Sequence, residues 1–278
     1  MKEKVNGGST YTPFLSRLRG EAKQVDVVLA IIPLLLVAVF LFPLETRRAF
    51  VFDYQNPTVM TAFSAHYVHL SISHLISNLI ACTIFLLLAY LLVLSNGVRG
   101  QLYTELFVIL FIFPVLLSYL NLAIPRSAVG YGFSGLNMAL LGYIAVEFTR
   151  YTGNYYLESI GVEDAIFSFL VLTTFVSAVY ARMYRIALFL TVASSVFALG
   201  YLVFADWSWR ELYPALIHSL ELRGYIELAV FTILIIIGYT STAFFNPVLE
   251  AGVTNVYIHF LGFCIGFINS YVFIYVNP

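Results

Sequence analysis

Charged residues are scarce in this chain of 278 residues, because Asp, Glu, Lys and Arg together make up only 10% of it. A soluble domain of this length carries about 25% charged residues. Basic and acidic residues are also nearly balanced, so the sequence offers no basic patch that would bind nucleic acid. Hydrophobic residues make up 61%. These shortages exclude an ordinary soluble domain and indicate a polytopic membrane protein embedded in a lipid bilayer.

Only two cysteines are present, Cys82 and Cys264, and both lie in apolar stretches. Their spacing matches neither a disulfide framework nor a metal motif, so we expect two buried apolar side chains. His66, His69 and His74 lie close together and would permit a metal site. No HExxH string and no carboxylate at ligand spacing accompanies them, so we expect no metal.

Long apolar runs are the main positive feature. A membrane-spanning helix needs about 20 mostly apolar residues. Eight stretches predict transmembrane helices: 27–44, 69–94, 103–124, 133–149, 164–181, 186–205, 225–244 and 256–276. We expect the segment 1–26 to be a cytoplasmic extension and residues 27–278 to form one transmembrane domain. The first run is long enough to remain as a span, so we expect no cleaved signal peptide.

The basic residues predict the orientation, because cytoplasmic loops carry an excess of lysine and arginine. With the N-terminus inside, nine basic residues are cytoplasmic: Lys2, Lys4, Arg17, Arg19, Lys23, Arg99, Arg150, Arg210 and Arg223. Five are then outside: Arg47, Arg48, Arg126, Arg182 and Arg185. We therefore expect a multi-pass protein of a cell membrane with a cytoplasmic N-terminus.

Ser134 stands at the predicted start of the fourth span, in the string Gly132-Phe133-Ser134-Gly135. The proline and glycines before it predict a non-helical approach, which is tolerated at membrane depth only inside protein or beside a wet cavity. The first N–H groups of a helix have no partner within the helix and point at whatever lies there. A peptide carbonyl attacked by Ser134 would develop its negative charge at that point.

His259 lies near the start of the last predicted span, and imidazole is well suited to take a proton from serine near neutral pH. His74 and Asn78 are spaced i, i+4 on the second span, so they share a face and both could donate to an oxyanion. With the N-terminus inside, all these residues lie at one depth near the outer side. No membrane-embedded acid suits the orientation of His259, so we expect a Ser–His dyad.

Small residues mark two helix faces that could pack closely. Gly262 and Gly266 form one face, and Gly135, Ala139 and Gly142 form the other. Their contact would bring the serine and the histidine within reach of each other. Taken alone, each polar residue has a structural explanation, such as a hydrogen bond between helices. Their common depth favours a reaction site.

Three strings resemble the rhomboid family of intramembrane serine proteases. They are His69-x4-His74-x3-Asn78, Gly132-Phe133-Ser134-Gly135 and His259-x2-Gly262-x3-Gly266. The resemblance covers about residues 27–149 and 245–276. It implies an all-α membrane protein with a rhomboid-like helical bundle, in which two extra spans within about 150–225 join the family's core of six. It also implies that no cofactor is needed.

The resemblance implies that Ser134 is the nucleophile and His259 its general base. His74, Asn78 and the backbone N–H of Ser134 would form the oxyanion hole. Other residues of the strings would support the site: His69, Gly132, Gly135, Gly262 and Gly266. An enzyme of this kind cleaves single-pass transmembrane proteins near the outer membrane face.

Two local features depart from the family. Many rhomboids have an aromatic residue four positions after the serine, where it stacks on the catalytic histidine, but this chain has Met138. The Trp-Arg signature of the first external loop is missing, and Arg47-Arg48 resembles it only loosely.

Two other functions are compatible with a membrane bundle. An inactive rhomboid-like protein would bind membrane clients without cleaving them, although both members of the dyad are present. A transporter would line a substrate path with His74, Asn78 and Ser134. That alternative predicts an internal repeat, and the two halves of the sequence show no convincing similarity.

Overall fold

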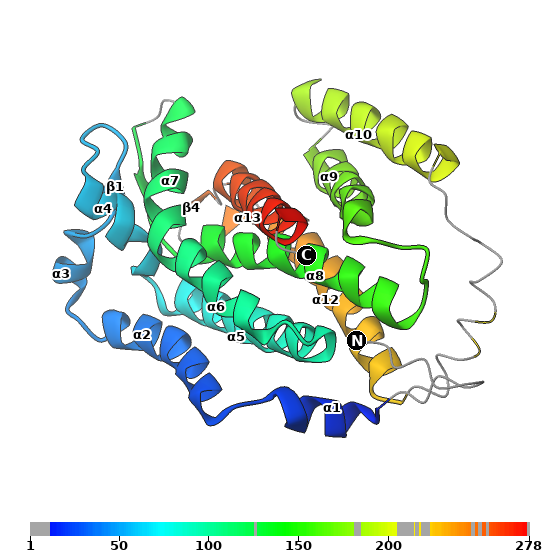
Figure 1. Ribbon diagram of the computed structural model, residues 1–278. Helices are drawn as coiled ribbons and strands as arrows, with labels where there is room; N and C mark the ends of the chain where they lie inside the picture. Colours follow the sequence, from blue (N-terminus) through cyan, green and yellow to red (C-terminus); the bar gives the residue numbers. More distant parts are fainter. Residues whose placement is uncertain are drawn as a thin grey trace.

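The computed structural model describes residues 12–124, 127–180, 185–204, 223–245, 248–249, 252–253 and 256–276, with residues 214 and 217. This part of the chain is mostly helical (Figure 1). In chain order its elements are α1 (Phe14–Glu21), the 3-10 helix η1 (Gln24–Ala30), α2 (Ile31–Phe40), α3 (Leu44–Arg48), β1 (Phe52–Asp53), α4 (Val59–Ser64), the 3-10 helix η2 (Ala65–Tyr67), α5 (Ile72–Asn96), α6 (Arg99–Phe107), the π-helix η3 (Val108–Ile112), α7 (Phe113–Leu120), the 3-10 helix η4 (Asn121–Ala123), β2 (Val129–Gly130), α8 (Ser134–Tyr155), the 3-10 helix η5 (Val162–Asp164), α9 (Ala165–Tyr180), α10 (Arg185–Phe204), α12 (Tyr225–Phe245), β3 (Val248–Leu249), β4 (Gly252–Val253) and α13 (Val256–Val276).

A helix lies in each of the eight stretches predicted to span the membrane. Among the described residues, three helices are long and apolar enough to cross a bilayer: Ile72–Asn96, Arg99–Ala123 and Tyr257–Val276. The helices Phe14–Glu21 and Gln24–Phe40 meet at a bend of 90° and would add a fourth span if taken together. These apolar helices indicate an all-α, membrane-embedded protein. Parts of the region predicted to hold the extra spans, 181–184, 205–213 and 218–222, lie outside the described residues.

Helix α8 is the central helix of the bundle, with α5 on one side and α13 on another (Figure 1). Every residue from Gly135 to Glu147 is buried. Because protein covers this stretch on all sides, it tolerates the polar residues Asn137 and Glu147, which would be costly against lipid. The candidate nucleophile, Ser134, is its first residue.

Glycines let α8 and α13 approach until their backbones touch. A Cβ atom added to Gly142 would lie 2.5 Å from both the carbonyl oxygen of Phe263 and the nitrogen of Phe267. Added to Gly266, it would overlap the carbonyl oxygen of Ala139, and added to Gly262 that of Gly135. The close packing of these two small faces, predicted from the sequence, is confirmed.

A short antiparallel sheet joins the loop before α8 to the first long loop of the chain. Strand β1 pairs with β2, with Phe52 opposite Gly130. At the end of β1, the side chain of Asn56 and the backbone N–H of Gln55 donate to Asp53, and these hydrogen bonds lower the pKa of its carboxyl group. The sheet therefore holds the segment that leads into Ser134 against a second, remote part of the chain.

The third apolar stretch contains a π-helix that the sequence analysis did not foresee. Residues Val108–Ile112 form one π turn between α6 and α7, and Pro114 follows in the first turn of α7. The hydroxyl of Tyr67 donates to the carbonyl of Leu110 within that turn. A π turn disturbs the regular i to i−4 ladder, so a side-chain donor is well placed to satisfy its carbonyl.

The described part of the N-terminal segment packs on the bundle. Arg17 in α1 donates to the carbonyl of Ser95, and Tyr225 at the start of α12 donates to the carbonyl of Thr12. Asp26 forms an ion pair with Arg99 at 2.5 Å and accepts a hydrogen bond from Tyr90 at 2.7 Å. These contacts fasten the segment to the ends of α5, α6 and α12.

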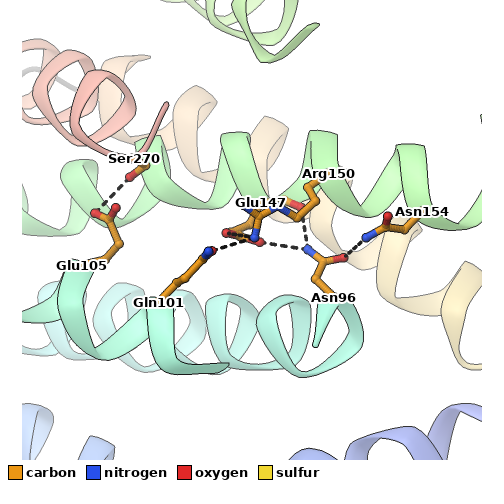
Figure 2. Close-up of polar contacts among 7 residues, drawn as sticks. All are labelled: Asn96, Gln101, Glu105, Glu147, Arg150, Asn154 and Ser270. Atoms are coloured by element: carbon orange, nitrogen blue, oxygen red, sulfur yellow. Dashed lines mark hydrogen bonds and ion pairs between the residues drawn. The ribbon is translucent and has the colours of Figure 1, made fainter. Parts of the chain in front are cut away.

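Two groups of polar contacts surround the buried carboxyl groups of Glu147 and Glu105: one joins α5, α6 and α8, and the other joins α6 and α13 (Figure 2). Glu147 is fully buried, pairs with Arg150 at 3.3 Å and accepts from Asn96 Nδ2 at 2.9 Å. Arg150 also donates to the side-chain oxygen of Gln101 at 2.7 Å. Glu105 is 1% exposed and accepts from two neutral groups, Asn269 Nδ2 at 2.8 Å and Ser270 Oγ at 3.1 Å. The two carboxyl groups therefore lie in different electrostatic surroundings, since Glu147 has a cationic partner and the described partners of Glu105 are neutral.

We expect Arg150→Met to lower the free energy of unfolding by about 3–5 kcal/mol, because it leaves the carboxylate of Glu147 buried without its cation. Glu105→Gln should have a much smaller effect, since an amide oxygen can accept the same two hydrogen bonds. The double variant Glu147→Gln/Arg150→Met should regain much of the loss. Reversible unfolding in mixed micelles measures all three. Equal losses for Arg150→Met and Glu105→Gln would contradict the expectation.

Candidate active site

The backbone before Ser134 is held by hydrogen bonds rather than by helical structure. Gly132 has a φ of +107°, which favours glycine, and its N–H donates to the carbonyl of Ala65 at 2.9 Å. The next N–H, of Phe133, points to Nε2 of His69 at 3.4 Å. This approach presents Ser134, which is half-buried, at the N-terminal end of α8. The first N–H groups of this helix have no carbonyl partner within it.

The first turn of α13 lies against the first turn of α8. His259 sits in that turn and is 6% exposed. A Cβ atom added to Gly135, the residue after Ser134, would lie 3.4 Å from Cγ1 of Ile258, the residue before His259. The structure therefore brings together the two helix turns that carry the predicted nucleophile and base.

The ring of His74 lies directly on the backbone that precedes Ser134. Its Cε1 atom would be 2.5 Å and its Nε2 atom 2.8 Å from a Cβ added to Gly132. The rings of His69 and Tyr131 contact it edge-on, at centroid distances of 5.1 and 5.5 Å. His74 thus lies against the backbone that leads into Ser134.

Asn78 lies one turn further along α5, and its side chain is engaged on two sides. Its Nδ2 donates to the carbonyl of His74 at 3.0 Å, and its Oδ1 accepts from Nδ2 of Asn137 at 3.2 Å. The sequence analysis did not single out Asn137. An amide three residues after the serine, in the first turn of an otherwise apolar stretch, is the signal that could have found it.

His69 supports the site from the loop before α5. Its imidazole is fully buried, and its backbone carbonyl accepts from a guanidinium N–H of Arg47. Arg47 also donates to the carbonyl of Phe42 at 3.0 Å and stacks over the ring of Phe40 at 4.1 Å. The arginine pair noted in the sequence therefore contributes one residue, Arg47, which joins the end of α2 to the loop that carries His69.

Met138 occupies the position where many rhomboids have an aromatic residue. It is fully buried, and its Cβ lies 3.3 Å from the place where a Cβ on Gly262 would stand. Since Gly262 is one helical turn after His259, this side chain packs between α8 and α13 below the histidine.

The three histidines that would permit a metal have separate partners. His66 shares a hydrogen bond with Ser118 Oγ at 3.1 Å, whereas His69 and His74 lie beside Gly132 and Phe133. In the part of the chain that the structure describes, no group of three or more His, Cys, Asp or Glu side chains is arranged to hold a metal ion.

Comparison of the chain with protein-family models, with curated proteins and with solved structures gives no match.

Proposed function

We propose that this protein is an intramembrane serine endopeptidase of the rhomboid type. The observation that carries the proposal is the contact between the first turns of α8 and α13, together with the ring of His74 against the backbone that precedes Ser134. Hydroxyl, imidazole and carboxamide groups are costly at membrane depth, and their convergence on one helix N-terminus favours a reaction site.

In the proposed reaction, Ser134 Oγ attacks a peptide carbonyl of the substrate while His259 takes the hydroxyl proton. The oxyanion that forms accepts hydrogen bonds from His74, Asn78 and the backbone N–H of Ser134. The peptide C–N bond then breaks, and His259 donates its proton to the leaving amine. Water, deprotonated by the same histidine, hydrolyses the acyl-enzyme and regenerates Ser134.

The proposal includes the membrane arrangement. The protein would lie in the cell membrane with eight spans, so both ends of the bundle would be cytoplasmic. Six spans would form the core, and two extra spans would lie between Ser134 and His259. The substrates would be single-pass transmembrane proteins, cleaved near the outer face. The buried site and the irregular backbone that precedes Ser134 suit a peptide bond that leaves the helical state before it is cut.

Covalent labelling by a fluorophosphonate probe tests the function. We expect the purified protein in detergent to be labelled, because the probe phosphonylates an activated serine, and Ser134→Ala to remain unlabelled. Ser73→Ala is the matched control, since Ser73 is an exposed serine near the start of α5. If the wild type stays unlabelled while an active rhomboid beside it reacts, the protease proposal fails and client binding without cleavage becomes the better explanation.

A further inference from the structure

Asn137 is a fully buried amide, three residues after Ser134 on the same helix. Its Nδ2 donates to both the backbone carbonyl and the side-chain oxygen of Asn78, each at 3.2 Å. It belongs to none of the strings that carry the rhomboid resemblance. Its contacts reach from α8 to one of the proposed oxyanion donors on α5.

Backbone carbonyls fix the orientation of both amides. A carbonyl oxygen only accepts hydrogen bonds, so the nitrogen of Asn137 must face the carbonyl of Asn78. The nitrogen of Asn78 must likewise face the carbonyl of His74, which turns its oxygen toward Asn137. The two assignments agree, and a flip of either amide would place like atoms together.

This arrangement leaves one N–H group of the Asn78 carboxamide without a described acceptor. The Asn78 carboxamide has two N–H groups, and one donates to His74. Among the described residues, the second has no partner. With the amide oxygen held by Asn137, that N–H is the group left to meet a negative oxygen near Ser134.

We propose that Asn137 is a positioning residue, which holds the Asn78 carboxamide so that its remaining N–H meets the oxyanion formed at Ser134. The inference rests on the proposed protease function and deepens it. Asn137 itself does not touch the reacting atoms and acts through Asn78.

Stability alone does not account for an amide at this position. Within the described residues, Oδ1 of Asn137 is buried without a hydrogen-bond partner. A buried polar group left in that state costs about 1–3 kcal/mol. A leucine of similar size would fill the space without this cost, whereas it could not orient Asn78.

Kinetics of fluorophosphonate inactivation test the inference. We expect Asn137→Leu to lower the maximal rate, kinact, by up to the roughly 10²–10³-fold that loss of one oxyanion donor costs, with KI unchanged. In the background Asn78→Ala, the same substitution should cause no further loss of kinact, because the carboxamide that Asn137 orients is already absent. Asn137→Ala, which removes the donor without adding a polar atom, should act in the same direction if the leucine variant does not fold.

Asn269→Leu is the matched control. It removes another helix amide, half-buried in α13, which donates to Glu105 several turns away from His259, so it should leave kinact unchanged. Wild-type kinact for both Asn137 variants, or an Asn137→Leu effect that persists in the Asn78→Ala background, would overturn the inference and leave the protease function standing. An unlabelled wild type would instead remove the function and the inference with it.

Discussion

Replacing His259 with alanine is expected to slow phosphonylation of Ser134 by about 10²–10⁴-fold, the contribution typical of a general base. A serine hydroxyl is a weak nucleophile until a neighbouring base takes its proton. The imidazole sits in the turn of α13 that contacts the serine turn of α8. Because the substitution leaves the probe-binding surface largely intact, the loss should appear in kinact, with KI nearly unchanged.

His66→Ala serves as the control for this prediction. It also removes a buried imidazole, but one that lies in η2 and shares a hydrogen bond with Ser118, away from the turn of α13 that contacts α8. Its kinact should stay close to that of the wild type. If His259→Ala reacts as fast as His66→Ala, the dyad is wrong, even if Ser134 itself is labelled.

Placing a methyl group on Gly266 is expected to reduce both stability and labelling sharply. The added Cβ would overlap the carbonyl of Ala139, so α13 must move away from α8. Overpacking of this kind costs about 1–3 kcal/mol, and more where backbone meets backbone. The displacement also carries His259 away from Ser134, so Gly266→Ala should lose labelling even at temperatures where it remains folded.

Gly238→Ala is the matched substitution for this experiment. Gly238 lies in α12 and is exposed, and no described atom stands within 4 Å of the place its Cβ would take. Alanine should therefore be neutral or stabilise that helix by up to about 1 kcal/mol. Thermal unfolding and labelling, measured in parallel, separate the two variants. Wild-type behaviour of Gly266→Ala in both assays would show that the helices do not need this contact.

The apolar runs and the small residues predicted the part of the fold that depends on local pattern. Runs of apolar residues located the helices, and Gly262 and Gly266 identified the face through which α13 meets α8. These features follow from helical periodicity and side-chain size, which a single sequence displays directly.

The missed features depend on contacts between remote residues. The bond from Asn137 to Asn78, the burial of Glu105 beside α13 and the pairing of β1 with β2 each join segments far apart in the chain. Periodicity carries no information about such partners. The π turn at Val108–Ile112 is similar, because its carbonyl is satisfied by Tyr67 from another loop. The predicted site residues lie around one helix N-terminus, but their chemical roles stay predictions until the labelling experiments are done.

The burial of α8 has a consequence for biosynthesis. Charged residues are costly in a helix that inserts into a membrane, and α8 carries Glu147 in its buried stretch and Arg150 one turn later. The ion pair and the contacts with Asn96 and Gln101 offset that cost only once α5 and α6 are already in place. The other side of α8 stays uncovered until α13, made much later, leaves the ribosome. During translation, one face of α8 therefore stays without its packing partner until α13 has been synthesised. The proposed nucleophile, Ser134, meets its base, His259, only at that last step.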